Sequence, residues 1–427
     1  MQPRILSNQL EEKIGQEVSL LGRLYALRKM GGITFAVLQD KEGLVQAVFE
    51  KEPAEIKVGS IVKLSGKVKR EERAPGGVEL EGQKLETITA VKEDYPFDLS
   101  KKELNLNINT LLDHRPLSLR HETQRDIFRV YGSILEGYSR FMRENGFIEI
   151  KTPKILGAAS EGGSNVFSVN YFGKRAFLAQ SPQFYKQIAT GIYERVFEIG
   201  TVFRAEKHFT SRHVNEYVSL DGEMGFIENE QDVMEMLENC LRSLFNFVAE
   251  EQAEILESRT VEPVLFPGGK FPALELTEIK KIIKEKYNYE VPADTDIDPE
   301  GEKLAGQYAK EELGSDFIFL TKYPVGDRPF YHFFDGDKTR SFDLLFRGIE
   351  IATGAQRIHE YDMLVDNIKK FGFNPDDFTF YLEAFKFAMP PHGGWGMGSE
   401  RLLYKLFNLD SVKEAILFPR DVKRLEP

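Results

Sequence analysis

The spacing of apolar residues changes once along this chain of 427 residues, and that change limits the possible folds more than any other feature. Between residues 16 and 92, short runs rich in Val, Ile, Leu and Phe alternate with turns that contain glycine or proline, a pattern typical of β-strands. From about residue 121, apolar residues recur instead at three- and four-residue steps, which indicates amphipathic helices. The sequence therefore predicts an all-β module followed by a larger module of mixed structure. The predicted strands of the first module are Glu17–Leu24, Ile33–Gln39, Gly43–Phe49, Ile61–Val68 and Val78–Val91.

The first module has the size of a small β-barrel. Five strands in about 75 residues fit an OB-fold, which often binds single-stranded nucleic acid, and the pattern alone also fits another small all-β domain. Residues 1–95 carry 15 basic and 15 acidic side chains, so the whole net charge of −12 falls on the rest of the chain. The first module therefore repels a polyanion less than the rest does. We predict domains at residues 1–95 and 121–427, joined by an extended polar linker at residues 96–120.

The larger module is predicted to be an α+β domain. Helices are expected around residues 127–142 and 233–248, where the helical spacing is clearest. Strand-like runs lie between and after these helices without a regular βαβ rhythm, which favours an antiparallel sheet. Those runs are Arg195–Phe203, Tyr217–Phe226, Phe317–Thr321, Ser341–Ile351 and Phe385–Met389.

Several classes of protein are excluded by features that the sequence lacks. The single cysteine, Cys240, rules out an intrachain disulfide framework and a cysteine-based metal cluster. No run of about 18 apolar residues occurs, and Met1 to Leu10 has no signal-peptide core, so we expect a cytoplasmic protein without a membrane span. Neither of the two common glycine-rich phosphate loops is present, so a nucleotide would be bound in another way.

Three segments carry residues suited to chemistry, although each alone is a weak signal. Phe147–Pro153 is expected to be a strand that ends at a proline, Phe203–Tyr217 joins a strand to a polar loop, and Gly394–Arg401 is a glycine-rich strand that leads into a helix. In this order and spacing they resemble the three signature motifs of class II aminoacyl-tRNA synthetases. With the N-terminal barrel, they resemble the subclass for aspartate, asparagine and lysine, from about residue 15 to the end of the chain. Four further strings are similar to aspartyl-tRNA synthetases of the compact archaeal and eukaryotic type: Ser160–Gly163, Gln180–Gln187, Gly354–His359 and Pro390–Gly394.

The resemblance implies that an amino-acid carboxylate attacks the α-phosphorus of ATP and expels pyrophosphate. Two anions must then approach each other, and cations must neutralise the charge that develops. Arg204 is implied as the α-phosphate contact, and Arg401 as an arginine that lies over adenine and reaches the γ-phosphate, as a planar guanidinium can. Glu350 and Thr353 are implied as ligands of Mg²⁺, which prefers hard oxygen donors. The other implied ATP contacts are Glu206, Arg212, His213 and Tyr217, with Glu350 counted among them.

The choice of amino acid is the sharpest implication of the resemblance. Lys186 and Arg357 match two cations directed at the side-chain carboxylate of the substrate, whereas asparaginyl enzymes carry an apolar residue in place of Lys186. A buried ammonium that faces a neutral amide would lack its counterion, at a cost of several kcal/mol, so aspartate is favoured over asparagine. The implied contacts of the substrate ammonium are Ser160, Gln183 and Asp221, and Glu161 lies on a loop expected to close over the substrate.

The barrel has implied contacts of its own. Phe35 and Gln46 match an aromatic that stacks on the central anticodon base and an amide that reads it, and such stacking contributes about 1–3 kcal/mol per base. Glu79 matches a contact to the neighbouring base. The turn at residues 73–77 resembles relaxed enzymes that charge tRNA(Asn) as well as tRNA(Asp). The implied partners are therefore these tRNAs, ATP and L-aspartate.

Taken together, the resemblance implies an aspartate–tRNA ligase that uses Mg²⁺ and needs no enzyme nucleophile. Because the first motif forms the subunit interface in this family, Pro153 and the helix before it imply a homodimer. Three alternatives remain: an asparaginyl enzyme, a non-catalytic RNA-binding paralogue, and a free-standing enzyme that makes asparagine from aspartate. Lys186 counts against an asparaginyl enzyme. The charged residues implied for ATP binding are all present, which counts against a non-catalytic paralogue. The N-terminal barrel counts against an enzyme that makes free asparagine. In addition, Gly222 replaces an aliphatic strand residue of relatives, so packing behind the pocket is expected to differ.

Overall fold

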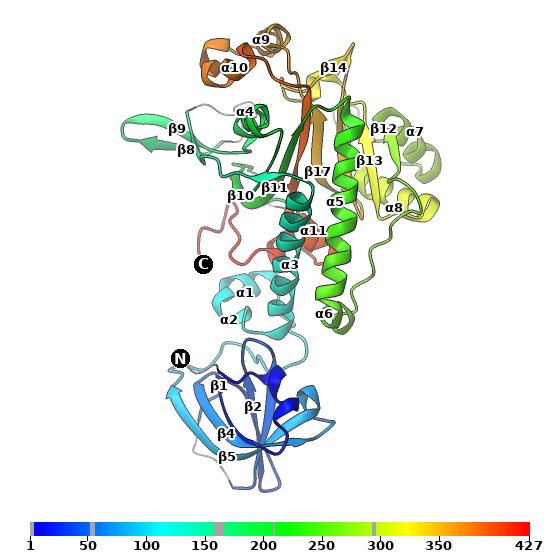
Figure 1. Ribbon diagram of the computed structural model, residues 1–427. Coiled ribbons are helices and arrows are strands. Elements are labelled where there is room, and N and C mark those ends of the chain that lie inside the picture. The colour runs from blue at the N-terminus through cyan, green and yellow to red at the C-terminus, as the bar shows by residue number, and fades with distance from the viewer. Residues whose placement is uncertain (1–3, 52–55, 158–165, 208–209, 293–295) are drawn as a thin grey trace. The chain divides into compact units, whose positions relative to one another are not determined.

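The computed structural model describes residues 4–51, 56–157, 166–207, 210–292 and 296–427. The chain forms two compact units, Met1–Asn107 with Pro116–His121, and Ile108–Arg115 with Glu122–Pro427. The first unit contains a barrel of strands, and the second contains a large sheet with long helices (Figure 1).

The first unit is built on a closed five-stranded barrel, in the order β1-β2-β3-β5-β4. Positions along β3 and β4 alternate between buried and more exposed, as expected when successive side chains point to opposite faces of a strand. The inward residues, among them Leu20, Leu64 and Leu80, form one apolar core. The strands are β1 (Glu17–Met30), β2 (Ile33–Gln39), β3 (Leu44–Phe49), β4 (Ile61–Arg70) and β5 (Val78–Thr89).

The segment of residues 96–120, predicted to be extended, contains two short helices, α1 (Ile108–Asp113) and α2 (Arg115–Ser118). The prediction is wrong here because the stabilising contacts come from distant parts of the chain. Leu111 and Leu112 are buried, and the fully buried Arg115 side chain donates hydrogen bonds to three carbonyl oxygens near the C-terminus.

The second unit is built on an eight-stranded sheet in the order β12-β13-β16-β17-β18-β11-β10-β6. Its central strands pair antiparallel, as predicted, whereas β12 with β13 and β6 with β10 at the two edges are parallel. The predicted run Ser341–Ile351 is divided by a turn at Arg347 and Gly348 into two strands. The strands of this sheet are β6 (Ile148–Glu149), β10 (Arg195–Phe203), β11 (Glu216–Gly225), β12 (Ala273–Glu275), β13 (Phe317–Thr321), β16 (Ser341–Phe346), β17 (Ile349–Gln356) and β18 (His392–Gly398).

Two small sheets accompany the large one. A three-stranded sheet contains β7 (Ile155–Leu156), β9 (Lys174–Leu178) and β8 (Ser168–Tyr171). A two-stranded sheet contains β14 (Phe334–Asp335) and β15 (Lys338–Thr339).

Two long helices, α3 (Glu122–Glu144) and α5 (Glu230–Glu251), confirm the helical spacing of the sequence. They lie against each other in Figure 1, and their buried faces join the sheet residues in the main apolar core. The predicted strand Phe385–Met389 is wrong, because Phe385 packs with Tyr381 and Leu382 at helical spacing. The remaining helices are α4 (Gln183–Tyr193), α6 (Ala253–Ser258), α7 (Leu276–Tyr287), α8 (Pro299–Leu313), α9 (Tyr361–Lys370), α10 (Thr379–Lys386) and α11 (Ser399–Leu406). Within the described residues, no helix combines the length and apolar character that a membrane crossing requires.

Gly222 on β11 makes room for the indole of Trp395 on β18. The two residues are register partners, and a Cβ atom at position 222 would lie 2.5 Å from the indole ring, closer than carbon atoms can approach. Trp395 is fully buried. A tryptophan therefore fills the space over this glycine, behind the site described next.

Candidate functional site

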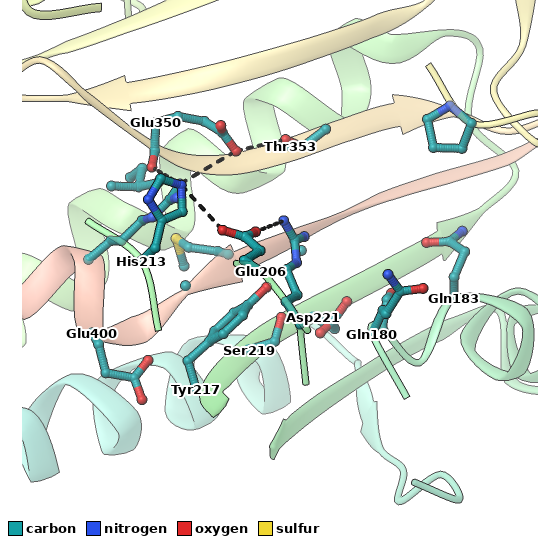
Figure 2. A pocket seen from close by; sticks show the side chains of 18 of the residues that line it. Gln180, Gln183, Glu206, His213, Tyr217, Ser219, Asp221, Glu350, Thr353 and Glu400 are labelled. Carbon is teal, nitrogen blue, oxygen red and sulfur yellow. Dashed lines mark hydrogen bonds and ion pairs between the residues drawn. The ribbon is translucent and has the colours of Figure 1, made fainter. Parts of the chain in front are cut away.

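A cavity of about 250 Å³ is lined by residues from β11, β17 and β18, from α4 and α11, and from the loop after β10 (Figure 2). Twelve of the residues predicted for the catalytic domain line it, so side chains far apart in sequence meet at one place. Two predicted residues, Ser160 and Glu161, lie outside the described residues. The twelve are Gln183, Lys186, Arg204, Glu206, Arg212, His213, Tyr217, Asp221, Glu350, Thr353, Arg357 and Arg401.

Arg204 and Tyr217 face each other at one end of the cavity, which we call the outer end. The guanidinium carbon of Arg204 lies 5.8 Å from the centre of the Tyr217 ring, and the Arg204 side chain is 46% exposed. The first residues after β10 are held by Asn215, whose side-chain amide donates hydrogen bonds to the carbonyl oxygens of Arg204 and Glu206. The backbone of Arg204 is thus held in place, while its guanidinium is nearly half exposed at the outer end.

Two further contacts with carboxylates border the outer end. His213 Nε2 lies 3.3 Å from the carboxylate of Glu206. Arg401, at the start of α11, donates a hydrogen bond of 2.6 Å to the carbonyl oxygen of Glu350 and lies 3.7 Å from its carboxylate. Figure 2 shows Glu206, His213 and Glu350 gathered above Tyr217. Arg204 and Arg401, which come from two different elements, therefore lie at the same end of the cavity.

Arg212 is paired with Glu302 of α8, a residue that the sequence analysis did not identify. The guanidinium donates a hydrogen bond to the Glu302 carboxylate, which also accepts one of 3.3 Å from the backbone N–H of Glu350. Burial raises the pKa of Glu302 to about 7, because Arg212 only partly offsets the loss of water. Since Glu302 lies 90 positions from Arg212, only the fold reveals this pair.

Glu350 and Thr353 place a carboxylate and a hydroxyl side by side at the cavity. Thr353 Oγ1 lies 3.1 Å from Glu350 Oε1 and 2.8 Å from Asp343 Oδ1. Asp343 itself is held by two hydrogen bonds of 3.0 and 2.6 Å from Arg328. Hard oxygen donors beside an open cavity fit Mg²⁺, which keeps several waters and also binds phosphate oxygens.

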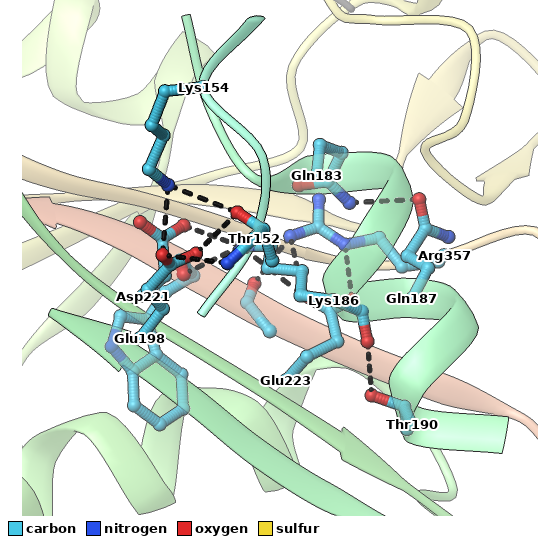
Figure 3. A network of polar contacts seen from close by, with 12 residues as sticks. Thr152, Lys154, Gln183, Lys186, Gln187, Thr190, Glu198, Asp221, Glu223 and Arg357 are labelled. Atoms are coloured by element: carbon cyan, nitrogen blue, oxygen red, sulfur yellow. Dashed lines mark hydrogen bonds and ion pairs between the residues drawn. The ribbon is translucent and has the colours of Figure 1, made fainter. Parts of the chain in front are cut away.

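Lys186 and Arg357 meet at the other end of the cavity, the inner end (Figure 3). Lys186 Nζ donates hydrogen bonds of 2.9 Å to Asp221 Oδ1 and to the carbonyl oxygen of Trp395, and it lies 3.3 Å from Glu223 Oε2. Arg357 donates to both oxygens of Glu223, at 2.9 and 3.4 Å. Both cations therefore contact the same carboxylate oxygen, which belongs to Glu223 of the protein.

Glu223 pairs with both of these cations, so the charges at the inner end include a carboxylate of the protein itself. Burial alone would raise the pKa of Glu223, but Arg357 and Lys186 outweigh it and hold the pKa below its usual value. With Asp221, the inner end contains two cations and two carboxylates, all almost fully buried. The prediction had the cations directed at a substrate carboxylate alone, whereas each also pairs with a carboxylate of the protein. Gln183 lies beside this group and donates to Gln187, one turn along α4.

The predicted anticodon contacts share the outer face of the barrel. Gln46 Nε2 donates a hydrogen bond of 2.8 Å to Glu79 Oε2, and Lys69 Nζ lies 3.1 Å from Glu79 Oε1. Phe35 is the register partner of Val48, two residues beyond Gln46 on β3, so its side chain lies on the same face. The structure thus brings Phe35, Gln46 and Glu79 together and adds Lys69, which the sequence analysis did not identify.

The matches to known families agree with this geometry. Residues 107–422 match the family described as tRNA synthetases class II (D, K and N). The chain belongs to this family. Residues 18–88 match the OB-fold nucleic acid binding domain, so both parts of the predicted architecture are confirmed.

Relatives of this synthetase match along their whole length. A protein of Deinococcus radiodurans named aspartate–tRNA(Asp/Asn) ligase is 44% identical over 434 residues, with 99% of each chain covered. A protein of Pyrococcus abyssi named aspartate–tRNA(Asp) ligase is 41% identical over 434 residues, with 98% of each chain covered. The solved asparaginyl-tRNA synthetase of Pyrococcus horikoshii, in complex with asparaginyl-adenylate, is similar with a TM-score of 0.90 at 29% identity over 100% of both chains. The predicted α+β fold with an N-terminal OB barrel is therefore confirmed.

Other residues also line the cavity of this synthetase without having been identified as site residues from the sequence, among them His332 and Glu400. His332 is 3% exposed, and burial together with the neighbouring cations lowers its pKa well below the usual value, so the imidazole is neutral. Glu400 accepts a hydrogen bond of 2.9 Å from the backbone N–H of Val218, and burial raises its pKa to about 7. Glu400 precedes Arg401 in the third motif and could have been found there, whereas His332 is placed only by the fold.

Proposed function

We propose that the protein is an aspartate–tRNA ligase. It activates L-aspartate with ATP to aspartyl-adenylate and pyrophosphate, and then transfers the aspartyl group to tRNA(Asp). The observation that carries this proposal is the charge arrangement of one cavity, with buried Lys186 and Arg357 at its inner end and Arg204 and Arg401 at its outer end. Together these ends suit an acidic amino acid beside a triphosphate.

The inner end selects aspartate through charge balance. Lys186, Arg357, Asp221 and Glu223 form a neutral set. Bound aspartate adds its ammonium and its side-chain carboxylate, so the set stays neutral. Asparagine adds only the ammonium and leaves one uncompensated positive charge in a buried place, which costs several kcal/mol. This balance of charges also disfavours an asparaginyl enzyme, even though one of the similar solved structures is an asparaginyl-tRNA synthetase.

The outer end stabilises the transition state of activation. A carboxylate oxygen of aspartate forms a bond to the α-phosphorus while the bond from that phosphorus to pyrophosphate breaks. Arg204 and Arg401 neutralise the charge that develops on the phosphate oxygens, and Tyr217 supports the nucleotide base. The residues position two bound reactants, and none of them acts as a nucleophile. Because these groups line one cavity, a non-catalytic paralogue is disfavoured.

Glu350 and Thr353 are the proposed holders of a divalent cation, in agreement with the use of ATP and a divalent metal in this family. When bound there, Mg²⁺ would supply positive charge that offsets the negative charge of the triphosphate. The protein contributes the carboxylate and hydroxyl oxygens, and Asp343 and Arg328 fix the position of Thr353 from behind.

The barrel is proposed to read the anticodon through Phe35 and Gln46 on its outer face. A short turn containing Pro75–Gly77 joins β4 to β5 near this face. It supports charging of tRNA(Asn) in addition to tRNA(Asp), as in the name of the relative from Deinococcus radiodurans. This barrel also disfavours a free-standing enzyme that makes asparagine. With tRNA as substrate, the proposed location is the cytoplasm.

A homodimer is proposed for the second unit. Strand β6 ends the large sheet, and an edge strand of this kind is a site for pairing with another chain. Ile148 on β6 is 46% exposed, and Phe226, directly after β11, which is separated from β6 by β10 alone, is 70% exposed. These apolar side chains support a contact with a second copy of the chain.

The deciding experiment measures ATP–pyrophosphate exchange with each free amino acid, followed by charging of transcribed tRNA(Asp) and tRNA(Asn) side by side. We expect exchange with aspartate and aspartylation of both tRNAs. Exchange stimulated by asparagine or lysine instead would contradict aspartate as the substrate. Aspartylation of tRNA(Asp) alone would contradict only the proposed charging of tRNA(Asn).

A further inference from the structure

His332 lines the cavity beside Arg357, one of the two cations of the inner end. The two residues form an isolated antiparallel bridge, and next to it the backbone N–H of Phe333 donates a hydrogen bond of 2.9 Å to the carbonyl oxygen of Gln356. Residues that lie directly opposite each other in an antiparallel pair carry their side chains on the same face. The backbone therefore holds the imidazole on the same face as the Arg357 guanidinium.

The imidazole of His332 has a nitrogen that the protein does not use. Nδ1 is enclosed and has no hydrogen-bond partner among the residues that the structure describes. Nε2 is not enclosed in this way, and no hydrogen bond joins it to those residues either, so it is the ring nitrogen that can meet a ligand in the cavity. A neutral imidazole has one N–H donor and one acceptor. A hydrogen on Nδ1 would have no acceptor and would lie near the positive charges of Arg357, Arg328 and Lys186, so the hydrogen belongs on Nε2.

Lys186 has acceptors within the protein for all of its N–H groups. An ammonium has three donors, and Lys186 Nζ has three acceptor oxygens. They are Asp221 Oδ1 and the carbonyl oxygen of Trp395, each at 2.9 Å, and Glu223 Oε2 at 3.3 Å. A hydrogen bond from Lys186 to a substrate would therefore cost one of these contacts. Lys186 supplies positive charge to bound aspartate, but a further directed donor for the side-chain carboxylate must come from another residue.

We propose that His332 donates a hydrogen bond from Nε2 to the side-chain carboxylate of bound aspartate and thereby contributes to recognition of the acidic side chain. The inference deepens the proposed function and rests on it. The charged groups of the inner end provide the charge balance, and the imidazole provides a directed contact. A hydrogen bond to a charged acceptor is roughly twice as strong as one to a neutral acceptor, so this contact favours aspartate over asparagine.

The test compares three substitutions of His332 by ATP–pyrophosphate exchange, with KM measured for aspartate and for ATP. His332→Leu removes both ring nitrogens. The amide NH₂ of His332→Gln can take the place of Nε2, whereas that of His332→Asn can take only the place of the enclosed Nδ1. We expect KM for aspartate to rise about thirtyfold in His332→Leu and His332→Asn, but less than about fivefold in His332→Gln. KM for ATP should stay unchanged in all three variants.

Asparagine provides a second measurement, as a competitive inhibitor of exchange with aspartate. Its carbonyl oxygen can accept the same hydrogen bond, but as a neutral acceptor it gains less from it. We expect the inhibition constant of asparagine to rise only about fivefold in His332→Leu. An equal rise for asparagine and aspartate would contradict a contact that favours the carboxylate.

His359→Leu is the matched control. Nδ1 of His359 is likewise enclosed without a hydrogen-bond partner among the described residues, but His359 is not one of the residues that line the cavity. Removal of this imidazole should leave KM for aspartate and for ATP unchanged. The control thus separates loss of an imidazole with an enclosed nitrogen from loss of a donor that faces the substrate.

Three outcomes of the KM measurements would overturn the inference: an unchanged KM for aspartate in His332→Leu, an equal rise of KM for aspartate and ATP, or equal values in His332→Gln and His332→Asn. The last comparison still decides if His332→Leu does not fold. Failure of the proposed function is distinguishable, because the unmodified enzyme would then show no aspartate-dependent exchange, and the inference would fall with it. Normal exchange by the unmodified enzyme together with any of the three outcomes would overturn the inference alone.

Discussion

The two ends of the cavity hold their cations in opposite ways. At the inner end, the side chains of Lys186 and Arg357 are 2% and 3% exposed and share the buried carboxylate of Glu223. At the outer end, Arg204 and Arg401 are 46% and 29% exposed, and the nearest carboxylates of their ion pairs lie 4.0 and 3.7 Å away. The cations at the inner end are thus held in a buried set of ion pairs, whereas those at the outer end are partly exposed and lie farther from their carboxylates, which suits the phosphate contacts that we propose for them.

Two buried carboxylates show the same contrast. Glu223 at the inner end has a lowered pKa because two cations outweigh its burial. Glu400 at the outer end accepts hydrogen bonds from the neutral groups of Val218 and Ser399, and burial raises its pKa to about 7. Burial therefore has opposite net results, depending on whether a cation is adjacent.

The largest expected effect comes from Lys186→Leu. Without the ammonium, bound asparagine leaves the inner end neutral and bound aspartate leaves it with an extra negative charge. We expect the ratio of aspartate to asparagine activation, measured by ATP–pyrophosphate exchange, to fall by about a thousandfold, which corresponds to several kcal/mol. Lys154→Leu is the control, since Lys154 pairs with Glu198 and not with the inner end. An unchanged ratio in Lys186→Leu would contradict the charge-balance mechanism.

Arg204→Ala should have the next largest effect and should leave amino-acid preference intact. Loss of one cation that acts on the transition state typically costs about a hundredfold in kcat, or about 3 kcal/mol. Because the Arg204 side chain is nearly half exposed, the melting temperature should stay close to that of the unmodified protein. Exchange kinetics with aspartate and asparagine measure both points. A shift in preference between the two amino acids would show that the ends are not independent.

Glu400→Gln should affect stability in a pH-dependent way. The folded protein retains the Glu400 proton up to about pH 7, whereas the unfolded chain releases it near pH 4.3. The free energy of unfolding therefore falls between those values as pH rises, by roughly 3–4 kcal/mol, and the variant avoids this loss. The melting temperature of the variant relative to the unmodified protein should rise from pH 5 to pH 8. A difference that does not depend on pH would exclude a raised pKa.

The smallest expected effect is that of Thr353→Ala on the magnesium requirement. One oxygen donor is lost while Glu350 remains, so the Mg²⁺ concentration for half-maximal exchange should rise about threefold. Thr353→Ser keeps the hydroxyl and should behave like the unmodified enzyme. Equal Mg²⁺ requirements in the alanine variant and the unmodified enzyme would remove Thr353 from the proposed site.

Much of the fold could be predicted because it depends on local patterns. The barrel strands and the helices α3 and α5 follow from the spacing of apolar residues, which reports directly on which face is buried. The helices α1 and α2 could not be predicted, since the groups that stabilise Arg115 lie about 300 positions away. The end of α10 was mistaken for a strand because a short apolar run fits either structure.

The sequence by itself determined the family, the order of the two parts, and the types of charged residue that serve the cavity, because motifs and periodicity are properties of neighbouring residues. Only the tertiary structure decided how those charges are paired: Glu223 between Lys186 and Arg357, Glu302 on Arg212, and Lys69 on Glu79. The physical reason is that electrostatic energy depends on distance and burial, and both arise only when strands and helices far apart in the chain pack together.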